Sequence, residues 1–123
     1  MTKLVKQRQK NDCVIAAVAT ITGRSYAEVR RVCGGPGLGM ENHEILWLLR
    51  QFGEWRQLSP RRCWTLSEWV EKYPDCIVCV GEIFAGEHAL AVVSGIVYDP
   101  ASNLLETNRD QGVVVAFIQE KPS

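Results

Sequence analysis

The stretch Asn11-Asp-Cys13-Val-Ile-Ala-Ala-Val-Ala-Thr-Ile-Thr22-Gly23 decides how the rest of the chain is arranged. Its alanines favour a helix over a strand, so we expect a helix over Cys13–Thr22. Asn11 or Asp12 is a suitable N-cap for this helix, and Gly23 supplies its C-terminal stop. Because the helix is apolar on nearly every side, we expect it to lie in the middle of the fold.

After this helix, the sequence predicts three more helices. Ser25, followed three residues later by Glu28, has the spacing of a capping box and predicts a helix that runs to Cys33. Apolar spacing predicts two further helices, over Glu41–Gln51 and from Thr65 or Ser67 to a point before Pro74.

Most of the strand-like runs follow these helices. They predict strands at Trp55–Leu58, Cys76–Val80, His88–Ser94, Ile96–Asp99 and Val113–Ile118, with loops at Gly34–Gly39 and Pro100–Asp110 and a turn at Gly86-Glu87. Helices first and strands second, with tight turns between the strands, indicate an α+β fold with a mostly antiparallel sheet. We expect one domain over residues 1–123.

Composition and charge exclude several classes of protein. The chain has 46% hydrophobic residues, 14 Lys plus Arg and 14 Asp plus Glu, so it is typical of a globular protein and lacks the basic excess of most nucleic-acid binders. No apolar run approaches a membrane span, and the basic segment from Met1 to Lys10 is not followed by the apolar segment of a secretory signal. Five dispersed cysteines then indicate free thiols in a reducing, cytoplasmic setting.

Cys13 is the first residue that points to chemistry. A thiolate at a helix N-terminus is stabilised by the partial positive charge there, and the N–H groups of the first turn can hold an oxyanion. The alternative is that Cys13 is a small buried apolar residue, which is the usual role of cysteine.

His88 and Asp99 complete a possible catalytic set. His88 opens a predicted strand and is the better candidate base of the two histidines, the other being His43. If the strands on either side of Ser94-Gly95 form a hairpin, Asp99 returns beside His88 and can orient its ring. Taken singly, His88 is more often structural, and Asp99 before Pro100 is more often a turn residue.

Two further patterns in the sequence bear on chemistry. Gln7, six residues before Cys13, can donate a side-chain amide to an oxyanion, with Gln9 as the competing candidate. Cys76-Ile-Val-Cys79 has the spacing of a metal or redox site, but residues three apart on a strand point to opposite faces and no second ligand pair is present. We therefore expect no metal and no organic cofactor.

The order Cys13, His88, Asp99 on a helix followed by a sheet resembles that of papain-like cysteine peptidases. The segments Gln7–Tyr26 and His88–Pro100 resemble the catalytic helix and the His strand of the bacteriocin-processing leader-peptide peptidases. They are still more similar to short papain-like chains common in bacteriophage and bacterial genomes. This resemblance covers about a third of the chain by segments and most of it by order of elements.

The resemblance implies a papain-like fold and a set of roles. Cys13 is the nucleophile, His88 the base, Asp99 the orienting residue and Gln7 the oxyanion donor. The implied function is hydrolysis of a peptide or isopeptide amide bond in a peptide or protein substrate. The implied setting is a bacterial cell, with the chain encoded by the bacterium or by a phage. One departure is Val14, where the family usually has glycine.

Two alternatives stay open. A catalytically degenerate module would bind a peptide or protein partner without cutting it. An acyl transferase, transglutaminase-like or amidase-like, would use the same residues on a different acceptor. The oligomeric state and the substrate sequence are not predicted.

Overall fold

Three helices precede most of the sheet, as the sequence predicted. The computed structural model describes residues 2–9, 11–35, 37–82, 86–101 and 109–121. In chain order its elements are α1 (Cys13–Thr22), α2 (Tyr26–Cys33), α3 (Asn42–Arg50), β1 (Glu54–Leu58), α4 (Leu66–Lys72), β2 (Cys76–Glu82), β3 (Gly86–Val93), β4 (Ile96–Tyr98) and β5 (Gly112–Lys121). The α+β class is thereby confirmed.

The strands form one antiparallel sheet in the order β1-β5-β2-β3-β4. The last strand of the chain, β5, therefore lies between β1 and β2, while β2, β3 and β4 follow one another as a meander. A two-residue loop joins β3 to β4, and Val93 pairs with Ile96 across it. Ser94 and Gly95 in this loop both have positive φ, 52° and 78°, as a type I′ hairpin turn requires.

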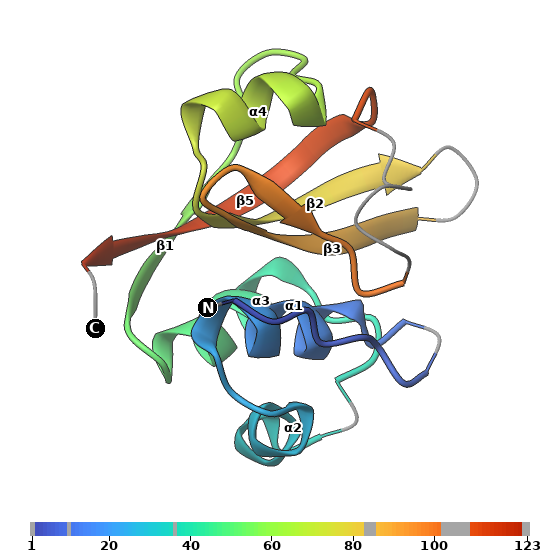
Figure 1. The fold of residues 1–123 in the computed structure, drawn as a ribbon, viewed down its shortest axis with the longest axis vertical. Helices are drawn as coiled ribbons and strands as arrows, with labels where there is room; N and C mark the ends of the chain where they lie inside the picture. The colour runs from blue at the N-terminus through green and yellow to red at the C-terminus, as the bar shows by residue number, and fades with distance from the viewer. Residues whose placement is uncertain (1, 10, 36, 83–85, 102–108, 122–123) are drawn as a thin grey trace.

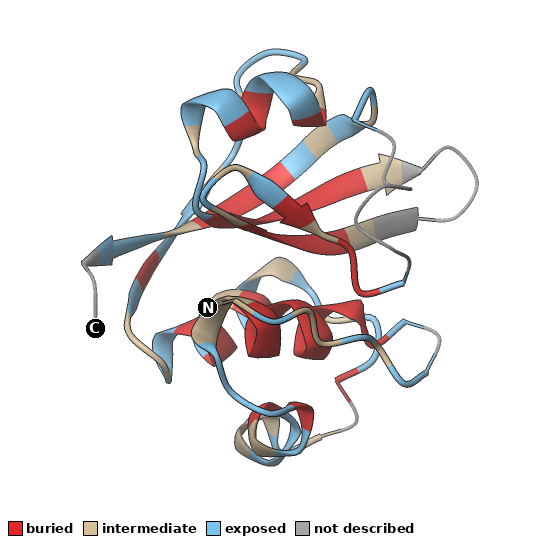
Figure 2. Ribbon diagram, viewed as in Figure 1, coloured by how far each residue is buried: buried red, intermediate tan, exposed pale blue. Residues whose placement is uncertain are grey.

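Helix α1 lies under the sheet in the centre of the molecule, as its all-round apolar sequence predicted (Figure 1). Every residue from Cys13 to Thr20 is buried. The side chains of Ile77, Cys79, Ala89, Ala91, Val115 and Phe117 belong to the same apolar cluster as this helix. Helix α3 lies beside α1 under the sheet, and α2 lies below α1, farther from the sheet (Figure 1). The buried residues of α1 and of the central strands stand out in Figure 2.

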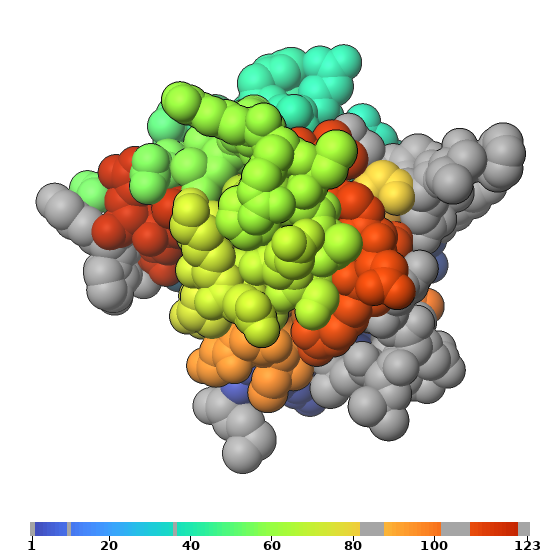
Figure 3. Space-filling view, turned by 90° about the horizontal axis from the view of Figure 1, so that it is seen from above, coloured from blue at the N-terminus to red at the C-terminus, as the bar shows by residue number. Residues whose placement is uncertain are grey.

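The opposite face of the sheet is covered by α4. Leu66, Trp69 and Val70 of this helix cluster with Val78, Leu90 and other residues of the sheet's second face. Seen from above, α4 covers the middle of this face, with β5 and the β3–β4 hairpin beside it (Figure 3). The sheet thus lies between α4 on one face and α1 with α3 on the other, and α2 packs against α1 on the side away from the sheet (Figure 1).

The predicted helix caps are present in part. Ser25 accepts a hydrogen bond from the N–H of Glu28, as predicted, but the Glu28 carboxylate pairs with Arg24. Of the two candidates for the start of α4, Thr65 is the cap, in a capping box with Glu68. Asp12 occupies the N-cap position of α1, yet its side chain makes no capping hydrogen bond.

One boundary prediction is wrong. Gly86-Glu87, predicted as a turn, are the first residues of β3, so His88 is the third residue of its strand and does not open it. Gly86 and Glu87 pair with Glu82 and Gly81 of β2, and this pairing overrides the turn preference of glycine. Parts of two predicted loops, Pro36 and residues 102–108, lie outside the described residues.

In the described part of the chain, no helix has both the length and the apolar character needed to cross a membrane.

Candidate functional site

Three elements bring the candidate residues together. The N-terminus of α1, the early part of β3 and the end of β4 lie at the same side of the molecule (Figure 1). Cys13 is the first residue of α1, His88 lies in β3, and Asp99 directly follows β4. The sequence prediction that Asp99 returns beside His88 across the Ser94-Gly95 loop is confirmed.

His88 and Asp99 form a hydrogen-bonded pair. The ring Nε2 of His88 lies 2.7 Å from Oδ1 of Asp99, and the two side chains are 19% and 11% exposed. The same Asp99 oxygen accepts the backbone N–H of Ala101 at 2.9 Å, which fixes the carboxylate. Because Asp99 occupies Nε2, Nδ1 is the ring nitrogen left for a second partner.

Cys13 is the second partner of the His88 ring, and it is largely buried. Its exposed fraction is 8%, and its Sγ accepts a hydrogen bond from the backbone N–H of Ala89 at 3.4 Å. β4 pairs with β3 only as far as Tyr98, which lies opposite Ala91. Ala89 lies beyond the end of this pairing, so no residue of β4 pairs with it. The sulfur at the start of α1 is thus in contact with the main chain of β3.

The electrostatics of His88 follow from these two neighbours. Burial lowers the pKa of His88, but hydrogen bonding and charge interactions with Asp99 and Cys13 outweigh it and raise the pKa to about 10. The imidazole is therefore cationic at neutral pH. A cationic imidazole beside a cysteine is the arrangement that activates a thiolate nucleophile.

Gln7 lies on the segment that precedes α1. Its backbone N–H donates to the carbonyl of Pro100 at 3.0 Å, and its side-chain Nε2 donates to the carbonyl of Gln9 at 3.0 Å. Its Oε1 is buried and has no hydrogen-bond partner among the described residues. The Gln7 main chain is thus tied to the residue after Asp99. The competing candidate, Gln9, is exposed.

Asp12 is a feature of the site that the sequence analysis missed. Its side chain is fully buried, and its Oδ2 accepts from the N–H groups of Arg8 and Gln9 and from the hydroxyl of Tyr26. Sequence signals suggested only a helix cap at this position. The contact with Tyr26 joins residues 14 positions apart in the sequence, and no local sequence pattern indicates it.

The remaining cysteines differ from Cys13. Cys76 belongs to the cluster on the α4 face and Cys79 to the cluster on the α1 face, as the alternation of the strand predicted. Burial, against a hydrogen bond with Trp69, raises the pKa of Cys76 to about 12. Cys33 is half-buried and Cys63 exposed, and all five cysteines are free thiols.

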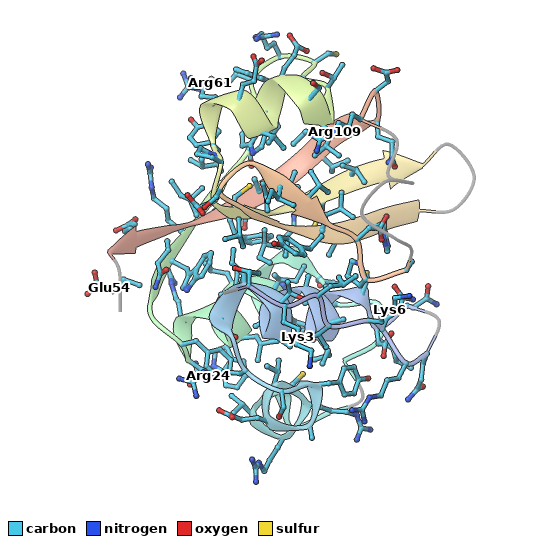
Figure 4. All side chains as sticks on the ribbon, in the orientation of Figure 1. Lys3, Lys6, Arg24, Glu54, Arg61 and Arg109 are labelled. Atoms are coloured by element: carbon cyan, nitrogen blue, oxygen red, sulfur yellow. The ribbon has the colours of Figure 1, made fainter. Side chains whose placement is uncertain are left out.

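Several other charged groups lie apart from the Cys13 site. The labelled basic side chains Lys3, Arg24, Arg61 and Arg109 lie on different parts of the molecule (Figure 4). Among the described residues, three possible metal ligands within 4.8 Å of one another occur in one group, formed by Glu41, His43 and Glu44. All three are exposed, and His43 pairs with Glu41 instead of belonging to the Cys13 site.

Comparisons of the chain with protein-family models, with curated proteins and with solved structures each found no match.

Proposed function

We propose that the protein is a cysteine-dependent hydrolase that cleaves a peptide or isopeptide amide bond. The observation that carries this proposal is the His88 ring, bonded to Asp99 at 2.7 Å and paired electrostatically with Cys13 at the start of a buried helix. Nucleophile, base and orienting residue within bonding reach are the signature of covalent catalysis. We also propose a papain-like fold, supported by a buried cysteine helix packed under an antiparallel sheet that carries the histidine.

The proposed reaction has two halves. The Cys13 thiolate attacks the carbonyl carbon, a C–S bond forms, and the oxyanion accepts hydrogen bonds from the Cys13 N–H and the Gln7 amide. The C–N bond then breaks, and the amine leaves with a proton from Nδ1 of His88. In the second half, His88 takes a proton from water, the hydroxide attacks the thioester carbon, and the Cys13 thiolate is released with the acid product.

Two details of the structure support these roles. The Asp12 side chain does not cap α1, so it leaves the first-turn N–H groups to other acceptors. Asp99 is itself held by the N–H of Ala101, so it can hold the His88 ring at Nε2 and leave Nδ1 to the thiol. A carboxylate in this position stabilises the imidazolium and keeps the ring in one orientation.

The test is acyl-enzyme formation with p-nitrophenyl acetate, followed by mass spectrometry. We expect the acetyl group on Cys13, a burst of p-nitrophenol, and no burst in Cys13→Ser. Because a positioned acid–base residue beside the nucleophile contributes about 100-fold or more, His88→Ala should slow the burst by at least that factor. Cys63→Ser, which removes the exposed thiol, is the matched control and should change nothing.

Acetylation of Cys63 at the same rate as Cys13 would contradict an activated nucleophile. Amide cleavage itself is then measured as new N-termini released from a peptide pool by the wild type and not by Cys13→Ser. An added amine that appears in the product would assign the protein to acyl transfer instead of hydrolysis.

A second candidate is a module that binds a peptide without cutting it. Val14 favours it, because the peptidases that the sequence resembles usually have glycine there, and the Val14 side chain is buried in the α1 cluster. Peptide binding by a wild type that forms no acetyl-enzyme would support this candidate over the hydrolase.

A further inference from the structure

Asp12, the residue before the proposed nucleophile, holds a network that the reaction steps above do not use. Its side chain is completely buried, with 0% exposed. Its Oδ2 accepts the backbone N–H groups of Arg8 and Gln9, both at 3.1 Å, and the hydroxyl of Tyr26 at 2.5 Å. A buried carboxylate is costly unless its oxygens accept hydrogen bonds. Oδ2 has three donors, whereas Oδ1 is buried and has no partner among the described residues, so the contacts of Asp12 are concentrated on one oxygen.

The network ties the N-terminal segment to the first turn of α1. Arg8 and Gln9 are exposed residues whose main chain is anchored through Asp12. Tyr26 adds a second attachment, because the Arg8 guanidinium lies 4.3 Å from the centre of its ring. Burial and the bond to Asp12 raise the pKa of Tyr26, so its hydroxyl remains a donor at neutral pH.

A chain of hydrogen bonds leads from Asp12 to Gln7. Asp12 Oδ2 accepts from the Gln9 N–H, and the Gln9 carbonyl accepts from Nε2 of Gln7 at 3.0 Å. Within the described part of the chain, Oε1 of Gln7 has no partner, so the Gln9 carbonyl is the hydrogen-bond acceptor that orients the amide. One N–H of that amide is used by Gln9, and the other stays available to a ligand.

We propose that Asp12 is a positioning residue: through the main chain of Arg8 and Gln9 it holds the Gln7 amide where the oxyanion forms. This inference rests on the proposed function, since it assigns Asp12 a role only in the acyl-transfer step. A charged acceptor suits this role because hydrogen bonds to a carboxylate are stronger than those to a neutral group.

The experiment compares two reactions of Cys13 in the full chain. Acetylation by p-nitrophenyl acetate passes through an oxyanion, whereas alkylation by iodoacetamide is a displacement at carbon and forms none. Loss of an oxyanion donor costs about 100-fold or more. We therefore expect Asp12→Asn and Tyr26→Phe to slow acetylation by about 10-fold or more, as partial losses of that effect, while alkylation changes by less than about 3-fold.

The matched control is Thr20→Val. Thr20 is 2% exposed, and its hydroxyl accepts the Val5 N–H at 2.9 Å, so it anchors the same segment to the same helix at the far end. This variant loses a comparable anchor and should keep the ratio of acetylation to alkylation at the wild-type value. The double variant Asp12→Asn with Gln7→Ala should acetylate no more slowly than Gln7→Ala alone.

Each outcome decides between the proposals. Equal loss of both reactions in Asp12→Asn and Tyr26→Phe would mean a merely structural role and would overturn the inference. So would wild-type acetylation in both variants, or full additivity with Gln7→Ala. A wild type that forms no acetyl-enzyme would instead overturn the proposed function, and this role of Asp12 with it.

Discussion

The two buried thiols Cys13 and Cys76 show how surroundings decide the chemistry of a residue type. Cys76 is fully buried, and its pKa of about 12 keeps it a thiol. Cys13 is almost as buried, but it has the Ala89 N–H on its sulfur and a cationic ring beside it. The two thiols thus differ in their polar neighbours more than in their burial, so burial alone does not distinguish a nucleophile from a core residue.

The charge state of His88 gives the first prediction at this scale. With a pKa of about 10, His88 should remain protonated well above the ordinary value of 6.5. In Asp99→Asn the carboxylate charge is gone, so the pKa of His88 should fall. The measurement is an NMR titration of the imidazole protons, which is simple because the chain has only two histidines.

His43 provides the reference signal for this titration, since its side chain is 76% exposed and lies outside the Cys13 site. A wild-type midpoint for His88 near 6.5 would show that the ring is not held in an ion pair with Cys13 and Asp99.

The sequence predicted the residues whose signals are local and missed those whose partners are distant. Cys13 was found from a helix start and Asp99 from the length of a hairpin. Asp12 looked like a helix cap, because no local pattern tells that its carboxylate meets Tyr26 across α1 and α2. The Ala89 N–H is a main-chain group and has no sequence signal at all.

Among the elements, the β3–β4 hairpin has the most direct effect on the site. Its two-residue loop fixes which residues pair, and that register brings Asp99 to His88. The hairpin was predicted correctly because its turn is encoded by Ser94-Gly95. The start of β3 was predicted wrongly because it depends on pairing with β2.

Gly95→Ala tests the loop. Gly95 has φ of 78°, and a Cβ there would meet nothing within 4 Å, so the cost is backbone strain alone. We expect the free energy of unfolding to fall by about 1 kcal/mol, measured by urea denaturation. Gly35→Ala is the control, since Gly35 has equal space and no positive φ. Equal effects of the two substitutions would contradict a strained turn.

At the scale of the whole molecule, the sequence predicted helices before strands and an antiparallel sheet, but not the strand order. It also did not predict that helices cover both faces of the sheet. The position of β5 between β1 and β2 depends on pairs such as Leu58 with Ala116, which lie far apart in the chain. Such pairings are selected by the packing of the complete core, which no local segment encodes.

The site also couples global stability to pH, because α1, β3 and the end of β4 meet there. The pKa of His88 is raised on folding, from 6.5 to about 10, so the native state holds a proton that the unfolded state releases. The stabilisation is complete below about pH 6.5 and is lost as pH rises through about 10. Cys76 acts in the same direction, but only above its ordinary value of 9.0.

Urea unfolding of the wild type and His88→Gln between about pH 6 and pH 9 isolates the contribution of His88. We expect the difference in free energy of unfolding to be largest at the acid end and to shrink by at most about 1.4 kcal/mol per pH unit. The Cys76 contribution cancels in the difference, because both proteins contain it. A difference that is constant with pH would mean that His88 does not gain a proton on folding, and that the three elements meet around a neutral ring.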